Sequence, residues 1–260
     1  MKTRKILTTL LPSLLMSGHA MAAGIAVNVD VPDGRGDGDA GIPTINDFIS
    51  QNPSSGLSAS DTFYNSTGGG NASNFGSNFG GGVVIGGFTV TTSHIDGLPN
   101  TGTNSGFNAG DTSHNDLNPI TEGYAFAAEG TIVTFDGLLV NSSVGDTITL
   151  SIWGIGDNIS QEGQFTVTYG GNLAAEGNVQ STLYNGATIT DRGDATGSIP
   201  FVNFTFVADG VTDDISFQID NGPGTGNATL NGFSLTVVPE PSSAALLGLG
   251  FMSLTLRRRR

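Results

Sequence analysis

Apolar and polar residues alternate regularly between residues 121 and 238, and this pattern predicts a series of short β-strands. The clearest case is residues 146–153, where Ile148, Leu150 and Ile152 fall on one face and hydroxyl side chains on the other. We expect strands at residues 122–127, 131–135, 146–153, 163–169, 179–184, 187–190, 199–208, 214–219 and 228–238. Gly232 marks an expected β-bulge in the last of these strands. Many short strands at this spacing indicate an antiparallel β-sandwich or barrel.

The first half of the chain shows a weaker pattern. Residues 24–31 alternate and predict a strand, and residues 83–92 predict another strand with a bulge at Gly86 and Gly87. Residues 44–50 predict a short helix. Residues 51–120 are otherwise rich in Asn, Ser and Gly, and the pattern leaves open whether they pack into the sandwich or form a flexible arm.

Charge is distributed unevenly along the chain. All 23 acidic residues lie between Asp30 and Glu240, and this stretch holds two basic residues, Arg35 and Arg192, which gives it a net charge of −21. Such a surface excludes nucleic acid as a partner and suits divalent cations, basic partners or neutral glycans, although solubility alone also accounts for it. The chain has no cysteine, which excludes disulfides, thiolate catalysis and cysteine metal sites.

The N-terminus has the three parts of a secretory signal peptide. Three basic residues among the first five are followed by the apolar run 6–16, and Ala20 and Ala22 form an A-x-A cleavage site. We therefore expect signal peptidase to remove residues 1–22, so that the exported chain begins at Ala23. The alternative is a retained N-terminal anchor.

The C-terminus also has three parts. Pro239 and Pro241 bracket Glu240 and hold the backbone extended, open to a processing enzyme. The uncharged run 242–256 follows. As a helix it would be roughly 22 Å long, which is short for a hydrocarbon core of about 30 Å. Snorkelling of Arg side chains and local thinning of the bilayer accommodate this mismatch. We expect a transmembrane helix here, held on the cytoplasmic side by four basic residues: Arg257, Arg258, Arg259 and Arg260. The alternative is a buried C-terminal helix with a basic end.

Together, the Pro-Glu-Pro, the Gly-punctuated apolar run and the arginine cluster resemble the PEP-CTERM sorting signal. The resemblance covers residues 239–260. It implies export by a Gram-negative bacterium that makes extracellular polysaccharide, with transient anchoring in the inner membrane. It also implies recognition by the membrane-embedded cysteine protease exosortase, cleavage near the Pro-Glu-Pro, and delivery to the cell surface or the extracellular matrix. It implies no catalytic activity.

The body between the two ends, residues 23–238, is expected to be one exported all-β domain. Residues 136–154 and 228–235 resemble segments of jelly-roll sandwiches of the galactose-binding-like kind. This resemblance implies a jelly-roll β-sandwich and, by analogy of fold alone, a carbohydrate ligand.

An acidic, Gly-rich stretch near the N-terminus is a candidate metal site. Asp33, Asp37 and Asp39 alternate with glycines and offer hard oxygen ligands on a flexible loop, which suits calcium. No Glu closes the loop as an EF-hand requires, so a solvated acidic loop is the alternative. No other cofactor is expected.

A second stretch is a candidate sugar site. Trp153 is followed by Asp157 and Asn158, and an exposed Trp beside such side chains stacks on sugars. The alternative is that Trp153, which ends its strand, belongs to the core.

Catalytic motifs are missing from the sequence. It contains no G-x-S-x-G, H-E-x-x-H or P-loop pattern, and none of its five Glu residues stands in a marked context. We therefore expect a structural or carbohydrate-binding component of the cell surface or extracellular polysaccharide matrix. The alternatives are a secreted glycan-active hydrolase or lyase, and a coat protein without a ligand.

Overall fold

The computed structural model describes residues 23–28, 44–65, 81–94, 102–103, 125–126, 130–153, 162–170, 172–180, 183–184, 187–188, 201–221 and 229–240. The expected signal peptide and the expected membrane segment 242–256 lie outside these residues. Within the described part of the chain, no helix is long and apolar enough to cross a membrane.

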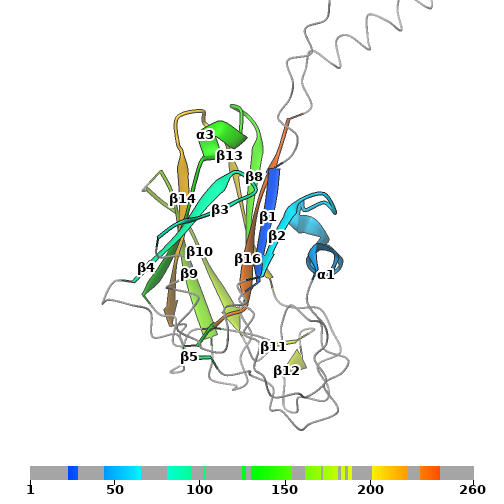
Figure 1. The fold of residues 1–260 in the computed structure, drawn as a ribbon. Helices are drawn as coiled ribbons and strands as arrows, with labels where there is room; N and C mark the ends of the chain where they lie inside the picture. The colour runs from blue at the N-terminus through cyan, green and yellow to red at the C-terminus, as the bar shows by residue number, and fades with distance from the viewer. Residues whose placement is uncertain are drawn as a thin grey trace, which may run out of the picture.

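Two large sheets face each other and form a β-sandwich (Figure 1). The five-stranded sheet has the order β13 (Phe201–Val207), β8 (Thr147–Trp153), β16 (Gly232–Val238), β1 (Ala23–Asn28), β2 (Thr62–Asn65). The six-stranded sheet has the order β10 (Asn172–Gln180), β9 (Glu162–Tyr169), β14 (Asp214–Asn221), β7 (Thr131–Asp136), β4 (Phe88–His94), β3 (Val83–Ile85). Two small sheets pair β11 (Leu183–Tyr184) with β12 (Ala187–Thr188), and β6 (Ala125–Phe126) with β5 (Gly102–Thr103) and β15 (Thr229–Leu230).

The connectivity is that of a jelly roll. From β7 onward, the chain repeatedly crosses between the large sheets, with β8, β13 and β16 in one and β9, β10 and β14 in the other. The expected all-β sandwich is therefore confirmed. One pair departs from the antiparallel pattern, because β1 and β2 run parallel. A parallel pair needs a crossover connection, and the chain between these strands contains the helix α1 (Ile45–Gln51) and the 3-10 turn η1 (Pro53–Ser55).

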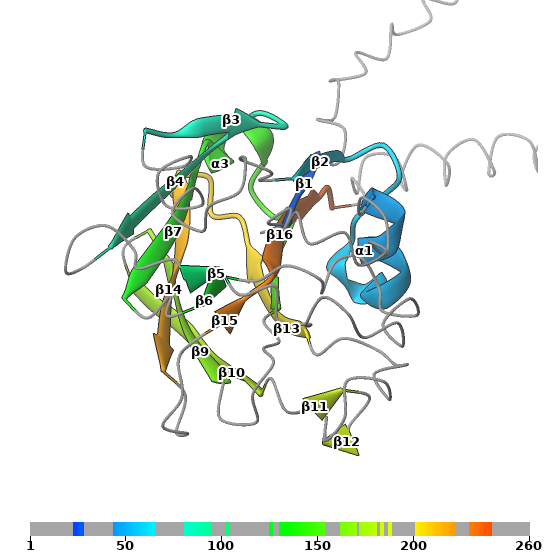
Figure 2. The same ribbon diagram turned by 60° about the horizontal axis from the view of Figure 1, so that its bottom comes forward.

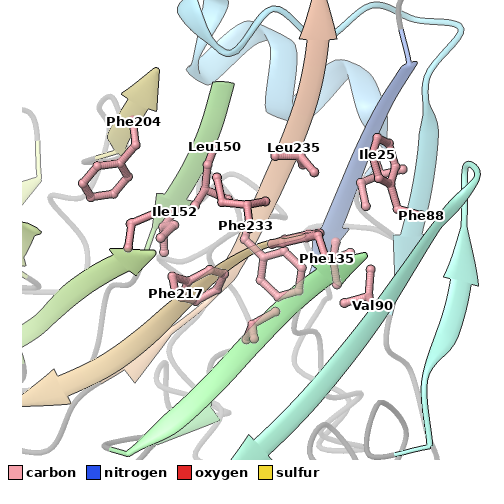
Figure 3. Close-up of a cluster of buried hydrophobic side chains, with 14 of the residues drawn as sticks. Ile25, Phe88, Val90, Phe135, Leu150, Ile152, Phe204, Phe217, Phe233 and Leu235 are labelled. Atoms are coloured by element: carbon pink, nitrogen blue, oxygen red, sulfur yellow. The ribbon is translucent and has the colours of Figure 1, made fainter. Parts of the chain in front are cut away.

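The inner faces of the two sheets form one apolar core (Figure 3). Ile148, Leu150 and Ile152 of β8 are fully buried, as the alternation predicted. Phe233 of β16 lies at the centre, with its ring 5.4 Å from those of Phe135 and Phe217. The strict two-residue period follows from burial of one face of each strand against the opposite sheet.

The outer face of the five-stranded sheet is covered as well. The predicted helix at residues 44–50 is confirmed as α1, and it packs Phe48 against this face. The covering turn η1 is tied down by the Thr236 hydroxyl, which donates to the Ser55 carbonyl oxygen at 2.6 Å. Central strands β8 and β16 are therefore buried on both sides. Most of their outward-facing residues are small or hydroxylated, and an exception is Trp153, which packs against Phe48.

Three sequence predictions are wrong in detail. Residues 83–92 form a hairpin, β3 and β4, because Gly86 and Gly87 have φ of 55° and 92° and make its two-residue turn rather than a bulge. Gly232 is no bulge either: Asn231 separates β15 from β16, which belong to different sheets. The strand expected at residues 179–184 is divided between β10 and β11.

The two ends of the sandwich differ. At one end, which we call the tail end, short described connections join the sheets: the segment 137–146 with the short helix α3 (Leu138–Asn141), and the segment 208–213. The opposite end, which we call the loop end, is where β1, β8 and β14 finish and β7, β13 and β16 begin. Figure 2 turns the loop end forward, with β5, β6 and β15 on it.

The core arrangement predicts a large effect for one substitution. Phe233→Ala removes a fully buried ring that contacts both sheets, and we expect the free energy of unfolding to fall by about 3–5 kcal/mol. The matched control is Val207→Ala on the exposed end of β13, where we expect a change within about 0.5 kcal/mol. Urea unfolding of residues 23–240 measures both values, and equal effects of the two substitutions would contradict this assignment of the core.

Candidate functional site

The structure brings together the two described strands that border the predicted processing sites at opposite ends of the chain. Strands β1 and β16 are antiparallel neighbours, and Ala23 pairs with Val237. The predicted signal-peptidase site, Ala20 and Ala22, directly precedes Ala23, and the Pro-Glu-Pro directly follows Val238. Neighbouring strands lie about 4.8 Å apart. Both chain ends therefore leave the sandwich side by side at the tail end.

Two residues of the sorting motif are described, and both sit against the sandwich. Pro239 is partly buried and Glu240 is exposed. The backbone N–H of Glu240 donates to Oδ1 of Asp146 at 3.2 Å, while the Ser143 N–H donates to Oδ2 of the same carboxylate at 2.7 Å. Asp146 is 5% exposed, so one buried carboxylate holds both the turn before β8 and the start of the motif. Pro241 lies outside the described residues.

The tail end is a hydrogen-bonded platform made by the two connections that cross between the sheets. The carbonyl oxygen of Asp213 accepts from the N–H groups of Gly137 and Leu138, and Oδ1 of Asp213 accepts from the Leu139 N–H at 2.9 Å. On the other side, the backbones of residues 145–146 and Ala208 exchange two hydrogen bonds, at 2.8 and 2.9 Å. These bonds fix the surface from which the motif leaves.

Acidic residues surround this platform, and their environments differ. Asp136 pairs directly with Asp214 across β7 and β14. Partial burial, then the charges of Asp214 and Asp213, raise the pKa of Asp136. The pKa of Asp209 is lowered to about 2. Its carboxylate accepts hydrogen bonds from the backbone N–H groups of Val211 and Thr212 and from the Thr212 hydroxyl, which stabilise the charged form. Among the described residues, no group of three potential ligands is placed to hold a metal ion.

Trp153 is a core residue in the structure, which is the second of the two alternatives left open above. Its side chain is fully buried, with its ring 4.5 Å from that of Phe48 and 5.0 Å from that of Phe201. Gly232, on the neighbouring strand, leaves the space that the indole occupies, since a Cβ there would collide with it. The prediction that Trp153 stacks on a sugar is therefore corrected: both neighbours of the ring are protein side chains.

The other predicted ligand residues lie outside the described part of the chain. These are the calcium candidates Asp33, Asp37 and Asp39, the sugar-site candidates Asp157 and Asn158, and the anchor residues Arg257, Arg258, Arg259 and Arg260. The ends of the strands that precede the two candidate stretches are described. Asn28 ends β1 and Trp153 ends β8, and both pair with Gly232 of the strand between them. Both stretches therefore start from the loop end, about 10 Å apart.

Sequence reasoning missed two polar features. One is Asp146, whose role depends on a contact with Glu240, 94 residues away in the sequence. The other is Asn28, which is fully buried at the loop end with no hydrogen-bond partner for its amide oxygen or nitrogen. The Ser151 hydroxyl, two residues before Trp153, is also buried without a partner. Neither feature had a signal in the sequence, because an Asn at the end of a strand and an Asp in a turn are common.

The contrast between two aspartates gives a prediction with opposite signs. Asp209 has a folded-state pKa below the usual 3.8, so its charge stabilises the fold above that value, and the contribution is lost as the pH falls towards 2. Asp136 has a raised pKa, so its charge opposes folding at neutral pH, and acidification relieves this. At pH 7 we expect Asp209→Asn to lower the melting temperature. We expect Asp136→Asn to raise stability by about 0.2–0.5 kcal/mol after solvent screening.

Thermal unfolding of both variants between pH 2 and pH 7 checks this, and the Asp209→Asn difference should shrink as the pH falls from about 4 towards 2. Shifts of the same sign at pH 7 would contradict the assigned environments.

A second prediction concerns the contact between the sandwich and the motif. Asp146→Ala leaves the N–H groups of Ser143 and Glu240 without their protein acceptor. Both residues are exposed, so water can replace it, and we expect a loss of about 0.5–1.5 kcal/mol per bond. We expect faster hydrogen exchange at these two amides, measured by NMR. The Ala208 amide is the internal control, because it donates to the backbone carbonyl of residue 146 and keeps its bond in the variant. Unchanged protection at Ser143 would rule out the contact.

Comparisons with known proteins support the C-terminal segment separately from the body. No curated protein matches the chain. Among solved structures, the chain is similar to the C-terminal CBM6 of LamC, a laminarinase from Zobellia galactanivorans. The identity is 12% and the TM-score is 0.29, and the match covers 56% of this chain and 98% of that one. It is also similar to a family 35 carbohydrate-binding module from Clostridium thermocellum, with 12% identity, 40% and 68% covered, and a TM-score of 0.27.

A third structure, an exo-beta-1,3-galactanase from Phanerochaete chrysosporium with beta-1,3-galactotriose, shows 13% identity, 56% and 28% coverage and a TM-score of 0.28, so the chain spans less than a third of that enzyme. At these TM-scores the likenesses add nothing to what the strand order already shows. Residues 237–260, in contrast, match the PEP-CTERM protein-sorting motif. They include the end of β16 and the Pro239-Glu240-Pro241 that the sequence pattern singled out. The C-terminus of this chain is a PEP-CTERM sorting motif, which implies export and membrane-transit sorting through exosortase.

Proposed function

We propose that the protein is an exported component of the cell surface or extracellular polysaccharide matrix that binds polysaccharide through the loop end of its sandwich. One observation carries the proposal: the sorting motif leaves from the tail end, whereas the two candidate ligand stretches start from the opposite, loop end. While the tail holds the protein at the membrane, the loop end is then directed away from the membrane, towards the matrix.

The residues proposed to bind are those that follow β1 and β8. Asp33 comes five residues after Asn28, and Asp157 comes four residues after Trp153. Because the two strands end about 10 Å apart, short segments of this length reach a common ligand. Asp33, Asp37 and Asp39 would supply carboxylate oxygens for calcium, and Asp157 and Asn158 would accept and donate hydrogen bonds to sugar hydroxyls. Trp153 is left out of this site because it is buried.

The charge of the body favours the same class of ligand. With two basic residues against 23 acidic ones between Asp30 and Glu240, the exported part repels anionic polymers unless a divalent cation bridges them. Neutral glycans carry no such penalty. The ligand we propose is therefore a neutral polysaccharide, or an acidic one bound through calcium.

The role is proposed as binding without catalysis. Glycoside hydrolysis needs two carboxyl groups facing each other across a bound sugar, about 5–10 Å apart. One group of neighbouring acids is described, and it lies at the tail end: Asp136, Asp213 and Asp214. Asp213 holds α3 in place there through hydrogen bonds to its first turn. Their arrangement serves the platform rather than a sugar cleft.

Binding to the producing strain's own exopolysaccharide tests the proposal. Residues 23–240 are co-sedimented with the polymer, with and without EDTA, and we expect saturable retention. Asp157→Asn combined with Asn158→Ala should weaken retention about tenfold, a loss of about 1.4 kcal/mol. Asp136→Asn, which removes the same charge at the tail end, is the matched control and should bind normally.

The outcomes separate the alternatives. Loss of retention in EDTA would show that binding needs a divalent cation, as the proposed calcium site after β1 requires. No retention in either condition would reject the binding role for that polymer. In that case a reducing-end assay on the same samples distinguishes a glycan-active enzyme from a coat protein without a ligand.

A further inference from the structure

Exposed apolar side chains gather at the tail end of the sandwich. Of the seven large apolar residues that are exposed in the described part of the chain, six belong to α3, to the two crossing connections, or to the ends of β13 and β16. We call these six residues the valine rim: Leu139, Val140, Val144, Val207, Val211 and Val238. Single exposed apolar residues are ordinary, but a gathered set marks a surface that meets an apolar partner.

The rim is presented by the platform described above. Val140, Val144 and Val211 are 83%, 74% and 79% exposed, although the backbone around them is held by the hydrogen bonds of Asp213 and Ala208. The Val144 side chain lies so close to Gly210 that no Cβ would fit there, so the side chain of one connection also packs on the backbone of the other. The exposed valines therefore project from backbone that the platform fixes in place.

The course of the chain identifies what this surface meets. Val238 ends β16, and the apolar run of the sorting motif begins at residue 242, four Cα steps later. Four steps span at most about 14 Å. The interfacial layer on each side of a bilayer is roughly 5–8 Å thick. If residues 242–256 are inserted, the tail end lies at or directly above the headgroups. The N-terminal strand adds a second constraint, since β1 begins at the same end.

We propose that the valine rim lies in the interfacial layer of a lipid bilayer while the sorting motif is inserted, so that the body rests on the membrane at a fixed orientation until it is cleaved. This rests on the membrane stage of the proposed function. The rim orients the folded body and holds the Pro-Glu-Pro at the lipid surface, where a membrane-embedded protease acts. Cleavage removes the inserted segment and leaves the small rim, which is too weak alone to keep the body on the bilayer.

The charges beside the rim determine which lipid it fits. Asp136, Asp209, Asp213 and Glu240 are all exposed at the tail end, and no basic side chain is described there. Anionic headgroups would be repelled by these carboxylates. The surface that fits the rim is therefore zwitterionic lipid, and contact should weaken as the anionic fraction of the bilayer rises.

Because the chain has no cysteine, single labelled positions test the proposal cleanly. The chain from Ala23 to Arg260 is reconstituted into phosphatidylcholine vesicles with an environment-sensitive dye at Val140→Cys or Val144→Cys. The control on the body is Ser93→Cys, exposed on β4 near the loop end. Leu247→Cys, in the apolar run, reports insertion of the tail independently. The vesicles carry nitroxide quenchers either near the headgroup or deep in the acyl chains.

The expected result is a blue shift at Val140 and Val144 with stronger quenching by the shallow nitroxide, deep quenching at Leu247, and no change at Ser93. Adding phosphatidylglycerol should reduce the shift at the rim but not at Leu247. A rim dye that stays in water while Leu247 is inserted overturns the proposal and leaves the membrane stage intact. A dye at Leu247 that is not inserted overturns both. A rim shift that depends on protein density rather than on lipid would indicate self-association and also overturns the proposal.

Discussion

The pairing of the first strand with the last one is the constraint on which the rest of the structure depends. β16 lies between β8 and β1 in the middle of the five-stranded sheet, and its inward residues Phe233, Leu235 and Val237 face the opposite sheet. The register that sets Ala23 beside Val237 brings the two chain ends to the same end of the sandwich. A shift of one residue would turn these inward side chains to the outside, so burial fixes the register and, with it, the positions of Ala23 and Val238, which border the two predicted processing sites.

The sequence pattern predicted the strands in which apolar side chains occupy one face and hydroxylated side chains occupy the other. Ile148, Leu150 and Ile152 were assigned to the core on alternation alone, and their complete burial confirms it. Two edge strands lack this signal: β2 and β10 pair on one side only and carry no clean alternation, so β2 was missed and β10 was misplaced. The edge strand β13 does alternate and was predicted. Gly86 and Gly87 fit both a bulge and a tight turn, and only the pairing of β3 with β4 distinguishes the two.

The candidate site could be predicted where it is local in sequence and not where it depends on distant contacts. The sorting motif occupies contiguous residues, so its parts were visible in the sequence and the match to residues 237–260 agrees. Trp153 was ambiguous because its environment is made by Phe48, more than a hundred residues earlier, and by Phe201. Asp146 looked like an ordinary turn residue because its partner, the Glu240 N–H, comes from the other end of the chain. Contacts of this kind arise only when the sheet has closed.

The position of β16 also links folding to export. If the chain is exported with its N-terminus first, the five-stranded sheet lacks one of its central strands until residues 232–238 have crossed the membrane, and these residues directly precede the Pro-Glu-Pro. The strands on either side of it, β8 and β1, each pair with β16 and not with each other. The body therefore reaches its complete core only when the sorting motif itself arrives at the outer surface of the membrane. A protease that acts on an extended motif beyond Val238 then meets a finished sandwich, because the strand that completes the fold and the segment to be cut are consecutive in the chain.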